Sequence, residues 1–281
     1  MRAGKTLRGK ANRLSLIIRV LVISGAATTF IVLTYLIGFI LIKGVPHLKP
    51  SLFALEYTTN NISLLPAAIN TILMVLLALA IAVPLGIFTA IYLVEYAKRG
   101  NKIVELIRLT TETLSGIPSI VYGLFGLLFF VTYLGWGYSL LAGAFTVAIM
   151  ILPLIMRTTE EALIAVPDTF REASFGLGAG RLRTVFRVVL PAAVPGILAG
   201  VILGIGRIVG EAAALIYTAG TVPEIPENLM SSGRTLAIHM YALSSEGLNF
   251  NEAYATAVVL LIVVLLINIL SGYAAKRMTK G

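Results

Sequence analysis

The stretch REASFGLGAGRLRTVFRVVLP, residues 171–191, combines four arginines, three glycines and a final proline in an otherwise strongly apolar chain. Glycines beside basic residues are typical of loops that cradle phosphate. The spacing fits no nucleotide motif, however, because Arg181 stands where G-x-G-x-x-G needs its last glycine and no strand precedes the cluster. The Gly-Lys-Thr at Gly4 lies too near the N-terminus to have the upstream glycine of a P-loop. We therefore expect no nucleotide site of either kind in this chain.

The same stretch predicts helices. Thr169 and Glu172 have the Thr-x-x-Glu spacing of a capping box, and Gly178 suits a left-handed C-terminal cap. We expect a short amphipathic helix over residues 170–177, followed by a second helix that leads to Pro191. The apolar residues that share one face of the short helix are Phe170, Ala173 and Leu177.

The composition places the chain in a bilayer. Hydrophobic residues make up 58% of it and charged residues 12%, and its mean hydropathy is +0.95. The absence of cysteine excludes disulfides, thiolate metal sites and cysteine nucleophiles. His47 and His239 have no nearby partner with ligand spacing, so we expect no metal site.

Six windows are long and apolar enough for helical spans, which need about 20 residues each. The first is too long for a signal-peptide core and lacks a cleavage site, so it should remain as a transmembrane helix. Lysines and arginines number eighteen on one side of these windows and three on the other, which predicts that both termini are cytoplasmic. The net charge of +9 then suits anionic lipid and requires no nucleic acid. The windows are residues 14–42, 66–94, 115–134, 139–156, 192–217 and 253–273.

Two ionisable residues, Arg207 and Glu211, fall inside the fifth window. A charge at mid-bilayer costs roughly 2.5–3.5 kcal/mol, so both should face protein or water. Four residues apart, they would share a helix face and partly neutralise each other, leaving arginine donors for an oxyanion. The alternative is a structural ion pair in a closely packed helix, favoured by small residues at Gly200, Gly204, Gly206 and Gly210.

The opening stretch resembles the EAA loop of ABC-importer permeases, whose pattern is E-A-A, three residues, G, nine residues, I-x-L-P. Here Glu172, Ala173 and Ser174 precede Gly178 at that spacing, and the pattern ends at Leu190 and Pro191. Ser174 and Val188 depart from it. The resemblance implies that the short helix docks into a groove of a separate ATPase subunit. A helix lying on lipid headgroups would also explain the amphipathic and basic character, but not the matched spacing.

From about residue 66 onward the chain resembles the PstA-type phosphate permeases. That resemblance implies an all-α integral membrane protein with six transmembrane helices, a MetI-like type I importer permease. It also implies that Arg207 and Glu211 lie on the route of the anion. Ala212 replaces the usual threonine, and Arg157 matches a family arginine but equally suits a positive-inside anchor. The stretches that carry the resemblance are RIVGE (207–211), AIYLVEYA (90–97), GIPSIVYGLFGL (116–127), LPLIMRTTEEAL (152–163) and TLAIHMYALSSEG (235–247).

The implied function is the permease subunit of an ATP-driven phosphate importer in the cell membrane. Its partners would be a second homologous permease, a dimer of ATP-binding subunits and an extracytoplasmic phosphate-binding protein. This chain would bind no cofactor, since ATP would lie on the partner subunits. We expect a basic cytoplasmic tail, first helix and external loop over residues 1–65, and a permease core of five transmembrane helices over 66–281 with its cytoplasmic EAA loop at 157–191.

Other functions stay open at this stage. An arginine-lined route attracts any oxyanion, so the substrate could be molybdate or sulfate. A secondary transporter is the next alternative, but no inverted repeat is visible and a docking loop would have no purpose there. A membrane scaffold that transports nothing would leave Arg207 and Glu211 without a role.

Overall fold

The computed structural model describes residues 3–58, 61–98, 100–247 and 249–278. Within these ranges the chain is helical, and its one strand-like pairing is an isolated bridge between Thr58 and Asn61. Five helices are long and apolar enough to span a membrane, and a bent helix pair makes a sixth. The all-α, six-span prediction is therefore confirmed. Of the basic residues counted for the orientation, Arg2, Arg99 and Lys280 lie outside the described ranges.

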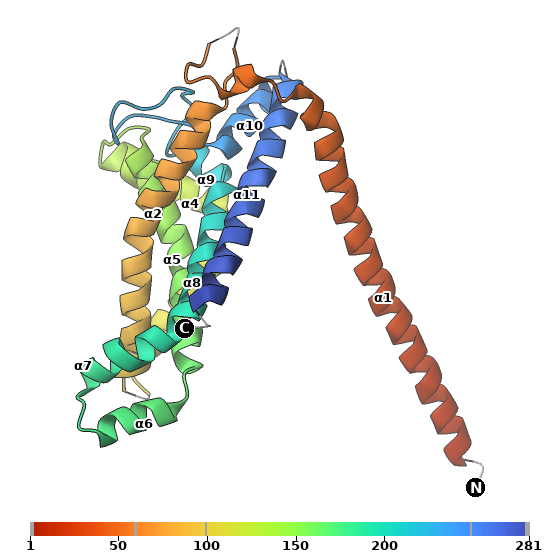
Figure 1. The fold of residues 1–281 in the computed structure, drawn as a ribbon, viewed down its shortest axis with the longest axis vertical. Helices are drawn as coiled ribbons and strands as arrows, with labels where there is room; N and C mark the ends of the chain where they lie inside the picture. Colours follow the sequence, from red (N-terminus) through yellow and green to blue (C-terminus); the bar gives the residue numbers. More distant parts are fainter. Residues whose placement is uncertain (1–2, 59–60, 99, 248, 279–281) are drawn as a thin grey trace.

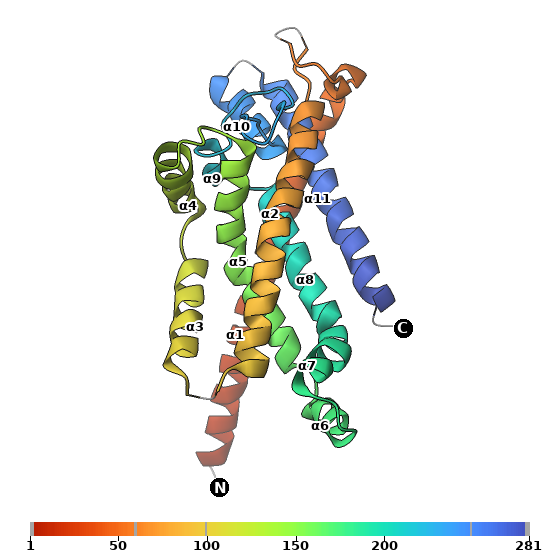
Figure 2. The same ribbon diagram turned by 90° about the vertical axis from the view of Figure 1, so that its left-hand side faces the viewer.

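The helices run alternately between two ends of the molecule (Figures 1 and 2). We call the end with α6 and α7 the lower end and the end with α10 the upper end. The described parts of α1 and α11 both point toward the lower half. The helices are α1 (Ala3–Gly44), α2 (Leu65–Ile91), α3 (Lys102–Ser115), α4 (Ser119–Gly126), α5 (Leu140–Ile164), α6 (Asp168–Gly176), α7 (Arg181–Thr184), α8 (Leu190–Val209), α9 (Ala213–Ile216), α10 (Leu236–Glu246) and α11 (Phe250–Met278), with π-helical turns at Tyr92–Tyr96, Leu127–Tyr133 and Val185–Val189 and 3-10 turns at Val45–His47 and Pro50–Phe53.

Helix α1 stands apart from the other helices (Figure 1). None of the apolar residues in its membrane-spanning part is buried, and it meets the body only near the upper end. There the ring of Phe39 packs edge-on against Tyr254 of α11, with 5.9 Å between ring centroids. Gly44 lies so close to the backbone of Tyr254 that any side chain would collide with it. The long apolar surface of α1 is thus left for lipid or another protein.

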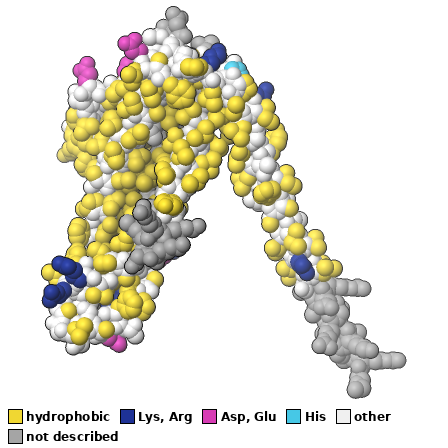
Figure 3. Space-filling view, in the orientation of Figure 1, with side chains coloured by type: hydrophobic (Ala, Val, Ile, Leu, Met, Phe, Trp, Pro, Cys, Tyr) yellow, Lys and Arg dark blue, Asp and Glu magenta, His cyan; other side chains and the backbone are white. Residues whose placement is uncertain are grey.

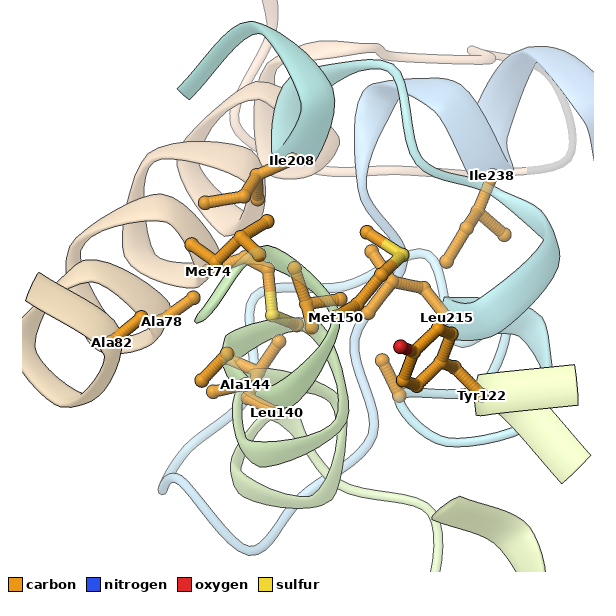
Figure 4. Packing of buried hydrophobic residues seen from close by; sticks show 14 of the residues in the cluster. Met74, Ala78, Ala82, Tyr122, Leu140, Ala144, Met150, Ile208, Leu215 and Ile238 are labelled. Carbon is orange, nitrogen blue, oxygen red and sulfur yellow. The ribbon is translucent and has the colours of Figure 1, made fainter. Parts of the chain in front are cut away.

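The main core lies where α2 and α5 cross, with contributions from α4, α8, α9 and α10 (Figure 4). Helices in lipid gain little from apolar burial against one another, so close packing through small residues matters more. Gly86 of α2 lies against Ile155, and Gly200 of α8 lies against Thr158, both on α5. The buried side chains drawn in Figure 4 include Met74, Ala78, Tyr122, Leu140, Met150, Ile208, Leu215 and Ile238.

The third window is not one straight helix over 115–134. Helix α3 already begins at Lys102, where the side chain of Asn101 accepts a hydrogen bond from the Ile103 amide. It ends at Ser115, and α4 and its π turn continue at 103° to it. Pro118 explains the break, because proline lacks an amide donor and disfavours helical geometry in the residue before it. The span is therefore bent.

The fifth window also differs from the prediction of a helix over 192–217. A continuous helical run extends from Arg181 through α7, the π turn and α8 to Val209. It stops at Gly210, and the short helix α9 follows only at Ala213. The span thus starts eleven residues early, in the loop, and is interrupted beside the two ionisable residues.

A candidate docking helix and translocation route

Helix α6 is the predicted amphipathic helix, shifted by two residues at its start. It begins at Asp168 after Pro167, and no side chain caps it, so the predicted capping box of Thr169 and Glu172 is wrong. Pro167 at the N-cap fixes the entry of the chain, and Asp168 places a carboxylate in the first turn, where the helix dipole favours it.

The end of α6 confirms the predicted glycine cap. Gly178 has a φ of +81°, in the left-handed region. Its amide donates to the carbonyl of Phe175 (2.9 Å), and the amide of Ala179 donates to that of Ser174 (3.1 Å). These two bonds form a Schellman motif, which satisfies carbonyls that a helix end would otherwise leave unpaired.

The outer face of α6 is uncovered at the lower end of the molecule, where hydrophobic and basic side chains gather (Figure 3). The exposed fraction is 49% for Phe170 and 89% for Leu177. Glu172 and Ala173 are exposed as well. Large apolar side chains in contact with water are unfavourable unless a partner covers them. The helix therefore has the form expected of a docking element.

The inner face of α6 is tied to the second helix of the loop. Ser174 is buried, and its hydroxyl lies 2.8 Å from that of Thr184 on α7. The serine that departs from the E-A-A pattern thus forms a hydrogen bond that alanine could not. From α7 the helical run continues past Leu190, which is half-buried, and Pro191, which is exposed. The π turn before them accommodates a residue that lacks an amide donor.

Arg207 and Glu211 do not form the predicted ion pair. Arg207 lies in the last turn of α8 and is exposed, while Glu211 lies beyond the helix end and is buried. The Glu211 carboxylate accepts a hydrogen bond from the amide of Ala214 (2.9 Å), so it caps the start of α9. The helix stops at Gly210, which removes the shared face that the four-residue spacing implied.

Arg157 lies on α5, not in a loop, and pairs with Glu161 one turn further on. The Nε to Oε1 distance is 3.1 Å, and both side chains are about two-thirds exposed. Such exposed pairs stabilise a protein little. They line a cavity of about 290 Å³ between α3 and α5, which also contains the ion pair of Arg108 with Glu160 at 2.5 Å. Sequence analysis missed Arg108 and Glu160, because their partnership joins two helices.

The upper end holds a buried arginine that sequence analysis counted only for orientation. Arg234 is 4% exposed, and its guanidinium carbon lies 4.6 Å from the centre of the Tyr57 ring. His239 packs edge-on against the same ring. Burial, and secondarily the charge of Arg234, lower the pKa of His239 from 6.5 to about 3. His239 is therefore neutral at any physiological pH.

Comparison with known proteins identifies the family. Residues 82–280 match the model of a family described as "Binding-protein-dependent transport system inner membrane component". The matched residues include α6, the cap glycine Gly178 and the break after α8, and they exclude α1. The fold therefore belongs to a component of a membrane transport system.

Two relatives and one solved structure agree with this assignment. The chain is 36% identical to the probable ABC transporter permease protein YqgI of Bacillus subtilis, over 87% of this chain and 89% of that protein. It is 36% identical to the phosphate transport system permease protein PstA of Pasteurella multocida, over 84% of this chain and 85% of that protein. A structure of the MetNI methionine ABC transporter in inward facing conformations has the same fold, with a TM-score of 0.58, 20% identity, and coverage of 86% and 97%. The chain is thus a multi-pass membrane protein that belongs to the family of binding-protein-dependent inner membrane components, the permeases of ABC transporters, and it is similar to the PstA type.

Proposed function

We propose that this permease is the membrane subunit of an ATP-driven importer of inorganic phosphate. The observation that carries the proposal is Arg207, an exposed arginine in a helix long and apolar enough to span a membrane, in a chain 36% identical to a phosphate permease. The guanidinium makes no hydrogen bond or ion pair with any other described residue, so its donors are available. Arginine stays protonated and binds an oxyanion through two parallel bonds.

The remaining site residues take roles that follow from their burial. Exposed Arg207 meets the anion, whereas buried Glu211 holds the break between α8 and α9 and so positions that arginine. Arg157, held by Glu161, attracts anions at the mouth of the route through the cavity between α3 and α5. This role is weaker than that of Arg207, because carboxylates outnumber arginines around the cavity.

The uncovered face of α6 supports a separate ATPase as the source of energy. Phe170 and Leu177 would enter a groove on that subunit, and Glu172 would pair with a basic residue there. ATP and its hydrolysis then belong to a dimer of such subunits, and this chain binds no cofactor. The lower end is accordingly cytoplasmic, as are both termini, in agreement with the excess of lysine and arginine on that side.

Two further partners complete the proposed importer. A second homologous permease would cover part of the apolar surface of α1, which α11 contacts only near the upper end. An extracytoplasmic phosphate-binding protein, in keeping with the family description, would dock at the upper end. Sulfate or molybdate is the alternative substrate, because the Arg207 chemistry is common to all oxyanions.

Uptake of radiolabelled phosphate by the native complex tests the proposal. The complex is purified through a tag on this chain and reconstituted in liposomes with ATP inside or outside. We expect uptake that excess sulfate or molybdate does not suppress, and at least a tenfold loss in Arg207→Gln. Arg19→Gln, which removes another exposed arginine from a membrane-spanning helix, α1, is the matched control and should transport normally. Suppression by sulfate or molybdate, or normal uptake by Arg207→Gln, would contradict the phosphate route.

A further inference from the structure

The guanidinium of Arg171, on the inner side of α6, uses all five of its N–H donors. Its side chain is 14% exposed. Nε and Nη2 donate to the Glu95 carboxylate at 3.1 and 2.7 Å, and Nη2 also donates to the carbonyl of Leu163 at 2.8 Å. Nη1 donates to the carbonyl of Val166 at 2.8 Å and to Asp168 at 3.1 Å. Arginine has no further donor, so this side chain is committed to holding its neighbours.

These partners belong to different elements. Glu95 lies in the π-helical turn that ends α2, and its side chain is only 8% exposed. Leu163 lies in the last turn of α5, and Val166 follows that helix. Carbonyls at a helix end have no partner within the helix, and Arg171 supplies one. One side chain of α6 therefore connects the lower ends of α2 and α5.

Little else connects α6 to α2. The backbone of α6 packs mainly against α7 and the π turn after it. A hollow of about 530 Å³, lined in part by Val94 and Phe175, separates α6 from the end of α2. Arg171 and Glu95 line this hollow and form the ion pair that ties α6 to the end of α2, whereas the Ser174–Thr184 hydrogen bond ties α6 to α7.

We propose that Arg171 and Glu95 form a transmission clamp, which carries a displacement of α6 into α2 and α5. Coupling then takes two routes, since the continuous helical run from Arg181 leads separately into α8. Arg171 and Glu95 are positioning residues, because neither touches a substrate or a nucleotide. Helices α2 and α5 share the most extensive helix contact in the molecule, so they would move as one unit. This inference rests on the proposed docking of α6 to an ATPase.

Conservative variants of the clamp provide the test. Glu95→Gln keeps the shape but removes the charge, and Arg171→Lys keeps the charge but cannot form five bonds. We expect both variants to assemble with the ATPase and hydrolyse ATP, while phosphate transported per ATP falls at least fivefold. Asp168→Asn is the matched control, because Asp168 also bonds Arg171 but is 87% exposed. It should keep the wild-type ratio.

Complex yield, ATP hydrolysis and uptake are measured together for wild type, the three variants and the double variant Glu95→Gln with Arg171→Gln. If either Glu95→Gln or Arg171→Lys transports as much phosphate per ATP as the wild type, the inference is overturned. If Glu95→Gln and Arg171→Lys fail to assemble with the ATPase, and the double variant restores both assembly and coupling, the pair is only a structural brace. That result would also overturn the inference. Failure of the wild-type chain to purify with an ATPase or to transport would instead refute the proposed function.

Discussion

Gly178, the left-handed glycine that caps the end of α6, allows the proposed docking helix to be weakened without changing its exposed apolar face. Gly178→Ala places a Cβ at a φ of +81°, where it meets no atom within 4 Å. The substitution therefore causes backbone strain and no collision. Left-handed geometry costs an L-residue about 1–2 kcal/mol, and the Schellman motif that ends α6 must bear this cost.

Gly176→Ala is the matched control for this change. Gly176 is the last residue of α6, also has open space around its Cα, and has no positive φ. Alanine stabilises a helix by up to about 1 kcal/mol relative to glycine. The two alanine substitutions, two residues apart, should therefore act in opposite directions. Gly178→Asn should fall between them, because asparagine tolerates the left-handed region better than alanine.

Hydrogen exchange of the native complex measures the effect directly. The amides of Gly178 and Ala179 donate in the Schellman motif, so their opening reports on it. In Gly178→Ala the alanine amide at 178 and that of Ala179 should exchange about 5–30-fold faster, the factor that corresponds to 1–2 kcal/mol. Transport per ATP should fall in the same variant. Equal acceleration in Gly176→Ala, or no difference between alanine and asparagine at 178, would refute the conformational argument.

Three further predictions follow from packing, charge and topology. Gly200→Ala pushes a methyl group into the hydroxyl of Thr158 on α5 and should destabilise the protein by about 1–3 kcal/mol. The control Gly206→Ala meets nothing within 4 Å and should not destabilise it. Thermal unfolding in detergent measures both effects. In the folded protein the pKa of His239 is about 3, whereas in the unfolded chain the imidazole takes up a proton below pH 6.5. The free energy of unfolding should therefore fall by about 3 kcal/mol between pH 6.5 and 4. It should fall less in His239→Gln. Because the chain has no cysteine, Glu227→Cys and Leu182→Cys give clean single sites, and an impermeant thiol reagent should label only position 227 in intact cells; labelling of 182 would invert the proposed orientation.

The apolar windows and the spacing of the EAA loop could be predicted because both are local properties of the sequence. A membrane span depends on the summed hydropathy of its residues. The left-handed cap depends on a single glycine at the end of an amphipathic helix. The two breaks within the predicted spans occur where a single residue outweighs that sum. Pro118 bends the third span, and Gly210 ends α8 before the window does. A hydropathy window averages over such residues.

The ion pairs that join different helices could not be predicted, because their residues are distant in sequence. Glu95 and Arg171 are 76 positions apart, and Arg108 meets Glu160 across two helices. The one pair that the spacing did predict, Arg207 with Glu211, required an unbroken helix that the structure lacks. Arg157 and Glu161 have the same four-residue spacing within an unbroken helix, and they do pair. Spacing therefore predicts a contact only where the helix continues.

The four arginines of the opening stretch divide according to their burial. The side chain of Arg171 is only 14% exposed and every donor is used, so it cannot bind an external anion and can act only on the chain that holds it. Arg181 lies over the ring of Tyr96, at 5.2 Å from its centre, and reinforces the same corner of α2. Arg183 and Arg187 are exposed on the run that leads into α8, where they can meet acidic groups of a partner or of lipid. The glycine-rich basic stretch is thus a short helix with a glycine cap, fastened to α2 and α5 by Arg171. In the proposed function its role is to dock the ATPase, and the anion meets Arg207 at the far end of the same helical run.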